Sequence, residues 1–408
     1  MKQLFSKQKS IFAVCWITYV LAYLCRVNFS SAMLKISQSM QVTSSQLGAI
    51  GSAFFTVYAL GQLVNGYIGD RISPYKFVTI AIVGTGILNL AVSMTNSYWV
   101  LFVLWTVNGY FQSMLWGPLM RILSQHFDRS QTVHISTGMS TSMVVGYITS
   151  WAVFGRAFLY RPWQTYFLIP ALMALTAGAL WIISSAERTR ATAAKPKPVA
   201  MPAAQILYTI KKQRLWLVAL VCLCMGLIKE SLSLWAPLLL TEMLHIQTET
   251  SLLLVIIIPI GNFMGILLAG KLMRRKNDVK KTLSYLFLAA VCCSASLFIT
   301  YRISPIGSVL AIAAVSGIMY GCNSLLLSYL PISFGGANIV STLVGLFDFS
   351  SYMGAALSSA LLGFALQSKN YLAVFGVWAL VLTVAFGLTM LFKLKAQNPA
   401  QEAGADAK

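Results

Sequence analysis

The chain has 408 residues, of which 58% are hydrophobic and only 10% are charged, and its mean hydropathy is +0.74. A soluble domain carries about 25% charged residues to cover its surface, so this composition excludes soluble enzymes, fibrous proteins and disordered chains. The net charge of +20 does not indicate a nucleic-acid partner, because the basic residues lie mostly between apolar runs. We therefore predict an all-α protein that crosses a membrane many times.

Runs without Asp, Glu, Lys or Arg divide the chain into membrane helices. A helix that crosses a bilayer needs about 20 mostly apolar residues, and the two longest runs, 77–120 and 303–347, each have room for two such helices. We predict twelve transmembrane helices, at about residues 11–33, 46–69, 75–95, 98–123, 133–157, 164–185, 214–241, 250–273, 282–301, 306–330, 338–366 and 371–393.

The basic residues fall mostly on one side of these helices. Of the 30 Lys and Arg residues, 23 lie in the terminal segments and in the loops that share their side, and five lie on the opposite side. Positively charged loops stay in the cytoplasm, so we predict that both termini are cytoplasmic. The expected location is a bacterial inner membrane. The basic excess would also attract anionic membrane lipids.

Residues 186–213 interrupt the apolar pattern. The segment is rich in Lys, Arg, Ala and Pro, and too poor in hydrophobic residues to span a membrane. We predict a basic cytoplasmic linker here. It separates an N-terminal six-helix bundle at 1–185 from a C-terminal six-helix bundle at 214–395, and a cytoplasmic tail follows at 396–408.

The two bundles carry traces of an internal repeat. Arg26 and Lys229, the two basic residues predicted to lie inside helices, are 203 positions apart, and Gly66 matches Gly270 at an offset of 204. Membrane-embedded charges at equivalent places in two repeats are typical of secondary transporters, whose substrate site lies near the midplane between the halves. We therefore predict two pseudo-symmetric bundles with a site between them.

The first predicted helix has a polar face. Tyr19, Tyr23 and Arg26 are spaced i, i+4 and i+7, so they share one face of a helix. A charge inside a membrane costs at least about 2.5 kcal/mol unless it meets water or a partner. The planar guanidinium of Arg26 suits a phosphate group, with the tyrosine hydroxyls as orienting donors. The alternative is a structural ion pair between Arg26 and a carboxylate of another helix.

Lys229 and Glu230 interrupt an otherwise uncharged stretch of helix seven. As the repeat mate of Arg26, Lys229 is expected to face the cavity and to supply a second positive charge. Glu230 could neutralise a neighbouring base or carry a proton, and a static salt bridge between the two residues is the other interpretation.

Asp348 is the only charged residue between Arg302 and Lys369. A lone carboxylate in apolar helices must be protonated, paired or hydrated. It therefore suits either an ion pair or a proton-coupling site. If Arg26, Lys229, Glu230 and Asp348 were all ionised their charges would cancel, whereas a site for an anion should be positive.

Four further polar or aromatic residues lie at membrane depth, and each could contact substrate or join neighbouring helices. Gln112 and Trp116 lie where Pro118 breaks helix four, and Tyr320 and Asn323 lie in helix ten.

Several stretches resemble a known family. The sequence GYIGDR, with Gly66, Asp70 and Arg71, resembles the loop signature of the major facilitator superfamily, and implies a conformational gate at the cytoplasmic end of helix two. YVLAYLCRVNFSSAM from Tyr19, NGYFQSMLWGPLMRILSQHF from Asn108 and GLFDFSSYMGAAL from Gly345 resemble the organophosphate:phosphate antiporters. The resemblance implies the major facilitator fold. It also implies that helix eleven packs beside helix seven, which makes Lys229 the favoured partner of Asp348.

Together these features predict a transporter that exchanges a small phosphorylated organic anion for inorganic phosphate by alternating access. One alternative is a proton-coupled symporter of a small organic anion or sugar acid that uses Asp348 or Glu230. Another is a membrane sensor built on a transporter fold. The sequence has no nucleotide-binding Gly-Lys-Ser/Thr loop, no metal-ligand spacing and no nucleophile with a base. We therefore expect no enzymatic activity, no cofactor and no metal, and a monomer.

Overall fold

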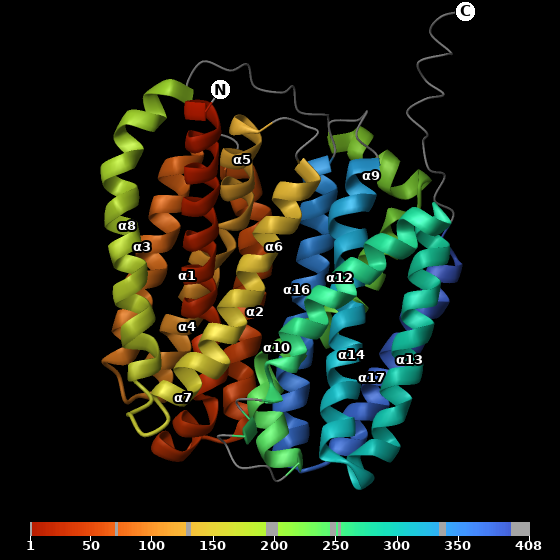
Figure 1. Cartoon of the computed structure of the whole chain (residues 1–408). Helices are drawn as coiled ribbons and strands as arrows, with labels where there is room; N and C mark the ends of the chain where they lie inside the picture. The colour runs from red at the N-terminus through yellow and green to blue at the C-terminus, as the bar shows by residue number, and fades with distance from the viewer. Residues whose placement is uncertain are drawn as a thin grey trace, which may run out of the picture.

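The computed structural model describes residues 2–69, 72–127, 132–192, 203–244, 250–251, 254–333 and 340–392. Within these ranges the regular structure is helical, and no strand occurs. Figure 1 shows the helices standing side by side in two groups. Helices α1 to α8, in red to yellow-green, form one group, and helices α10 to α17, in green to blue, form the other.

The first group begins with the longest helix of the described chain. Its elements are α1 (Lys2–Met40), α2 (Ser44–Gly69), α3 (Pro74–Ser93), α4 (Tyr98–Ser113), α5 (Trp116–His126), α6 (Thr132–Ile148), the π-helical turn η2 (Thr149–Phe154), α7 (Gly155–Ala157) and α8 (Thr165–Thr192).

The second group follows a short connecting helix, α9 (Ala203–Lys212). Its elements are α10 (Leu215–Leu244), α12 (Ile257–Lys276), α13 (Val279–Ile303), α14 (Pro305–Ser324), the π-helical turn η3 (Leu325–Tyr329), α15 (Leu330–Ser333), α16 (Val340–Gln367) and α17 (Tyr371–Met390).

The helices supply twelve membrane spans, as predicted. Ten helices in the described ranges are long and apolar enough to cross a membrane on their own. Two further spans are each built from consecutive pieces, α4 with α5 and α6 with η2 and α7. The first of these breaks falls between Ser113 and Trp116, next to Pro118, because proline lacks the backbone N–H that a helix interior needs.

The segment between the bundles contains more helix than its composition indicated. Helix α8 continues to Thr192, and α9 occupies Ala203–Lys212. Ala, Glu and Arg favour helix formation, which explains the extension of α8 beyond its apolar part. In α9, the apolar residues Leu207 and Ile210 lie on one face of the helix and Lys212 lies on the opposite face, so this helix is amphipathic.

Glycines allow close contact between helices. A Cβ atom added to Gly265 of α12 would overlap the backbone of Gly317 in α14, and one added to Gly321 would lie 2.6 Å from the carbonyl oxygen of Gly265. Across the two halves, a Cβ on Gly48 of α2 would lie 2.7 Å from the carbonyl oxygen of Ser359 in α16. Without a hydrophobic force between helices in lipid, such close packing is a main source of association.

We expect Gly265→Ala to destabilise the protein by about 1–3 kcal/mol, because the added methyl group overpacks the contact of α12 with α14. Gly376→Ala in α17 is the matched control, since no heavy atom lies within 4 Å of a Cβ built there. Both changes raise helix propensity equally. Thermal unfolding in detergent should show a loss for the first variant alone, and equal stability of the two variants would contradict the packing argument.

Candidate functional site

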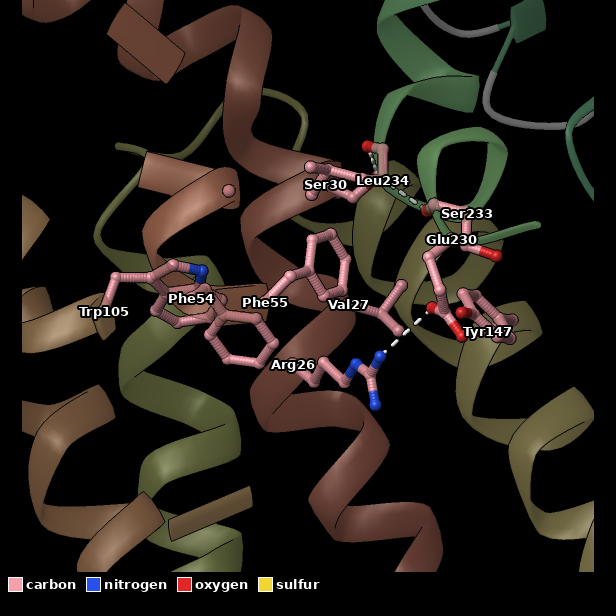
Figure 2. A pocket seen from close by; sticks show the side chains of 11 residues that line it. Arg26, Val27, Ser30, Phe54, Phe55, Trp105, Tyr147, Glu230, Ser233 and Leu234 are labelled. Atoms are coloured by element: carbon pink, nitrogen blue, oxygen red, sulfur yellow. Dashed lines mark hydrogen bonds and ion pairs between the residues drawn. The ribbon is translucent and has the colours of Figure 1, made fainter. Parts of the chain in front are cut away.

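The two halves meet where α1 crosses α10. Arg26 of α1 contacts Glu230 of α10, and the Ser30 hydroxyl donates to the carbonyl oxygen of Leu234 at 2.5 Å (Figure 2). Both pairs are separated by 204 positions, one more than the 203 positions between Arg26 and its repeat mate Lys229. Residues that contact the direct neighbour of their own repeat mate must lie close to the pseudo-two-fold axis between the halves. This contact therefore places Arg26 and Glu230 at the centre of the molecule.

Three charged side chains form a cluster on this axis. A Glu230 carboxylate oxygen, Oε2, accepts from Arg26 Nη2 at 3.1 Å, and the other, Oε1, lies 2.9 Å from Lys229 Nζ. All three residues are buried, with exposed fractions of 8% for Arg26, 5% for Lys229 and 3% for Glu230. We name Arg26, Lys229 and Glu230 the charged cluster. It holds two cations and one anion, and so keeps a net positive charge.

Aromatic rings surround Arg26. Its guanidinium carbon lies 4.9 Å from the ring centre of Tyr58, 5.3 Å from that of Tyr352 and 5.7 Å from that of Tyr23. The Tyr352 hydroxyl is also 3.4 Å from both Nη1 and Nη2. Ring faces attract a cation without bringing a second charge. They stabilise Arg26 while leaving its positive charge available to an anion.

Lys229 is held by the C-terminal half. Its ammonium donates to Asn323 Oδ1 at 2.9 Å and lies 5.2 Å from the ring centre of Tyr320. The Tyr320 hydroxyl is 3.2 Å from Ser233 Oγ and 3.5 Å from the hydroxyl of Tyr147, a residue of α6. The structure thus brings the predicted residues Tyr320 and Asn323 to the charged cluster.

The other predicted contact residues lie at different distances from the cluster. Tyr23 lies against Arg26, whereas Tyr19 lies one turn nearer the N-terminus of α1. The ring centre of Tyr19 is 5.2 Å from that of Tyr23 and 4.9 Å from that of Trp116. Gln112 donates to the backbone carbonyl of Ala22 at 3.0 Å, so it joins α4 to α1.

Asp348 does not make the ion pair expected of it. It is partly buried in α16, and the ion pairs among the described residues do not include it. The described residues therefore show no direct ion pair between Asp348 and Lys229, and neutralisation of Lys229 by Asp348 remains a prediction. Glu230 takes that position, because its carboxylate bridges Lys229 and Arg26 and so compensates two buried cations at once.

The predicted conformational gate lies largely outside the described residues. Gly66 belongs to α2, three positions before the end of this helix at Gly69, and Asp70 and Arg71 lie outside the described residues.

The sequence interpretation missed several aromatic residues of the site. Tyr352 carried a usable signal, because it lies four positions after Asp348 on the same helix face, within a stretch already compared with the family. Tyr58 and Tyr147 carried none, since aromatic residues make up 12% of the chain and nothing local marks these two.

A small cavity adjoins the charged cluster. It is lined by residues of both halves, namely Arg26, Val27, Ser30, Gly51, Phe54, Phe55, Trp105, Tyr147, Glu230, Ser233 and Leu234 (Figure 2). The space open to the centre of a water-sized sphere is about 20 Å³, and one water molecule needs about 10–15 Å³ by this measure. The cavity beside the Glu230 carboxylate has room for little more than a water molecule.

Metal-ligand clusters of three or more His, Cys, Asp or Glu residues are absent from the part of the chain that the structure describes. The chemistry of the site therefore consists of hydrogen-bond donors, two cations, one anion and aromatic faces, which can bind and release an anion.

Two pseudo-symmetric groups of membrane-spanning helices, with a buried charged cluster between them, are the architecture of secondary transporters. The sequence matches the model of the Major Facilitator Superfamily over residues 15–359, and the chain belongs to this superfamily.

Two curated relatives agree with the resemblance seen in the sequence. The chain is 23% identical to the membrane sensor protein UhpC of Salmonella typhimurium, over 97% of this chain and 93% of that protein. It is 24% identical to the glycerol-3-phosphate transporter of Bacillus subtilis, over 88% of this chain and 86% of that protein. The predicted resemblance to the organophosphate:phosphate antiporters is thereby confirmed, and so is the prediction that the chain is not an enzyme.

A solved structure shows the same fold. The crystal structure of a bacterial homolog of the human lysosomal transporter Spinster, in an inward-facing and occupied conformation, matches with a TM-score of 0.70 over 94% of each chain at 15% identity. At that identity the match supports the fold alone.

We expect Asp348→Asn to change the free energy of unfolding by no more than about 1 kcal/mol, because Glu230 already compensates Lys229. Thermal unfolding of the purified protein in detergent measures this. A loss of about 3–5 kcal/mol, the cost of breaking a buried pair on one side, would show instead that Asp348 holds Lys229. In that case Lys229→Met in the same molecule should recover part of the loss.

Proposed function

We propose that this chain is a secondary active transporter that exchanges a small phosphorylated organic anion for inorganic phosphate by alternating access. The observation that carries the proposal is the convergence of Arg26 and Lys229, one from each half, on a single pair of carboxylate oxygens. Phosphate oxygens in the same place would accept from both cations, and the planar guanidinium could donate two parallel hydrogen bonds.

The neighbouring groups suit a phosphorylated substrate. The Tyr352 hydroxyl lies 3.4 Å from Arg26 Nη1, and the ring of Tyr320 lies near Lys229. Both tyrosine hydroxyls could donate to further oxygens of the phosphate. The rings of Phe54, Phe55 and Trp105 line the other side of the cavity and offer apolar surface to an organic part (Figure 2). Among the relatives, the Bacillus protein bears the name of a glycerol-3-phosphate transporter, which agrees with this substrate class.

The charges also provide a reason for coupling movement to binding. When Glu230 does not bridge them, Arg26 and Lys229 would be two uncompensated cations, which are costly to enclose in a closed site. An anion that bridges Arg26 and Lys229 removes this cost and links the two halves, so that the halves can close around it and open to the other side. Gly66, Asp70 and Arg71 at the end of the second span are proposed as the gate of this movement.

We further propose the following topology. The bundles comprise 1–185 and 214–395, the linker 186–213 and the tail 396–408 are cytoplasmic, and the protein is a monomer of a bacterial inner membrane. The distribution of Lys and Arg supports this orientation. The amphipathic and basic helix α9 suits contact with anionic lipids on the same side.

Two other functions have one supporting observation each. Likeness to UhpC, which is named a membrane sensor and is matched over 97% of this chain, favours a sensor that binds the same class of anion without transporting it. The partly buried Asp348, without an ion pair among the described residues, favours a proton-coupled symporter.

One experiment separates the three functions. The purified chain is reconstituted into liposomes that contain or lack phosphate, and uptake of labelled phosphate is followed with and without an imposed pH gradient. We expect uptake to be faster into liposomes that contain phosphate than into liposomes that lack it. Uptake that ignores internal phosphate and follows the pH gradient would indicate a symporter, and binding of phosphate without any flux would indicate a sensor.

We expect Arg26→Lys to lower phosphate exchange at least about tenfold while the amount of protein in the membrane stays the same. The charge remains, but the second parallel hydrogen bond is lost, and hydrogen bonds to charged groups contribute about 1.5–3 kcal/mol. Arg302→Lys, at an exposed position at the end of α13, is the matched control and should exchange phosphate as the unchanged protein does. Unchanged exchange by Arg26→Lys would contradict this prediction, because it would show that the site needs only the positive charge of Arg26 and not its two parallel hydrogen bonds.

A further inference from the structure

We propose that Glu230 is an internal counter-anion: its carboxylate occupies the phosphate position in the empty carrier and allows the empty carrier to close and change sides. The inference rests on the proposed function, because it assigns a regulatory part to the same site. Its consequence is that exchange is accompanied by net transport, in which the carrier returns without a second substrate.

The contacts of Glu230 are those a bound phosphate would make. One carboxylate oxygen, Oε2, lies 3.1 Å from Nη2 of Arg26 in the N-terminal half. The other, Oε1, lies 2.9 Å from Nζ of Lys229 in the C-terminal half. The carboxylate is thus a bridge between the halves that presents two anionic oxygens to two cations. A phosphate group that binds the same donors must displace it from at least one of them.

The size of the cavity supports this exclusion. With Glu230 in place, the space beside Arg26 holds little more than a water molecule. An organic phosphate cannot enter unless the Glu230 side chain leaves Arg26 or the halves move apart. The carboxylate and the substrate therefore compete for one position.

Electrostatics then determines what the empty carrier can do. Without Glu230, closing the empty site would enclose two cations at the centre of the membrane, and this cost would restrict movement to the loaded carrier. With Glu230 ionised, the charged cluster carries one net positive charge and both cations have a partner. Compensation of both cations by Glu230 would therefore allow the halves to approach each other when no other anion is bound, and the hydrogen bond from Ser30 to Leu234 joins the halves beside it.

A purely structural ion pair makes a different prediction. If Glu230 only holds the halves together, its removal weakens folding but leaves the balance between exchange and net transport unchanged. The ratio of these two fluxes is the readout that separates the two roles.

The experiment compares the unchanged protein with Glu230→Gln in liposomes loaded with labelled inorganic phosphate. Efflux is measured into buffer with phosphate, which reports exchange, and into buffer without phosphate, which reports return of the empty carrier. We expect measurable efflux into phosphate-free buffer from the unchanged protein. In Glu230→Gln the ratio of net efflux to exchange should fall at least tenfold.

Glu242→Gln is the matched control, since Glu242 is a partly buried carboxylate on the same helix, twelve positions further on and outside the charged cluster. Its flux ratio should equal that of the unchanged protein. A second measurement does not depend on transport. Phosphate should raise the melting temperature of Glu230→Gln more than that of the unchanged protein, because the vacated cations bind the added anion.

The outcomes distinguish this inference from the proposed function. If the unchanged protein exchanges phosphate and the flux ratio of Glu230→Gln is unaltered, the counter-anion role is overturned and the exchanger stands. If the unchanged protein moves no phosphate, the proposed exchanger is overturned, and the melting temperatures alone decide the role of Glu230. Equal stabilisation of both proteins by phosphate would then overturn that role as well.

Discussion

The arrangement of this protein depends on the compensation of two cations buried in lipid-embedded helices, one from each half of the molecule. Neither Arg26 nor Lys229 can be solvated by the membrane, and each lies more than nine-tenths buried in protein. They share a single compensating carboxylate, so the electrostatics of one half is completed only by the other. Whatever anion lies between them therefore controls the contact of the halves.

The aromatic surroundings explain how such a site remains open to exchange. Arg26 is enclosed mainly by ring faces and by the Tyr352 hydroxyl, which attract the cation but do not neutralise it. A second carboxylate in their place would fix the cation permanently and remove the reason to bind an anion. The uncharged aromatic side chains therefore stabilise the positive charge of Arg26 and leave it able to bind an anion.

Most of the fold could be predicted from the sequence because the membrane imposes a strong rule. Spans of about 20 apolar residues and the side preference of Lys and Arg are local properties that survive without knowledge of packing. The helices in and beside the linker were not predicted, because the search for spans considers only long apolar segments. Helix formation at Thr192 and in Ala203–Lys212 follows from propensity and amphipathicity, not from the capacity to span.

The site was predictable only where charge marked it. Arg26, Lys229 and Glu230 stand out because charged residues are rare in apolar helices, and the repeat offset related the first two. The partner of Lys229 could not be derived, since Glu230 and Asp348 are both carboxylates and the choice depends on side-chain geometry across three helices. Tyr58 and Tyr147 belong to the site only because the fold brings them close to Arg26 and Tyr320, and the sequence alone does not show this proximity.

The position of the charged cluster near the central axis has a consequence for the symmetry of the molecule. At the offset of 203 that relates Arg26 to Lys229, Glu230 corresponds to Val27 of the first repeat. Two copies of the first half would therefore place two arginines near the axis and no carboxylate between them. The single carboxylate, present in one repeat only, makes the two halves chemically distinct at the point where these helices meet.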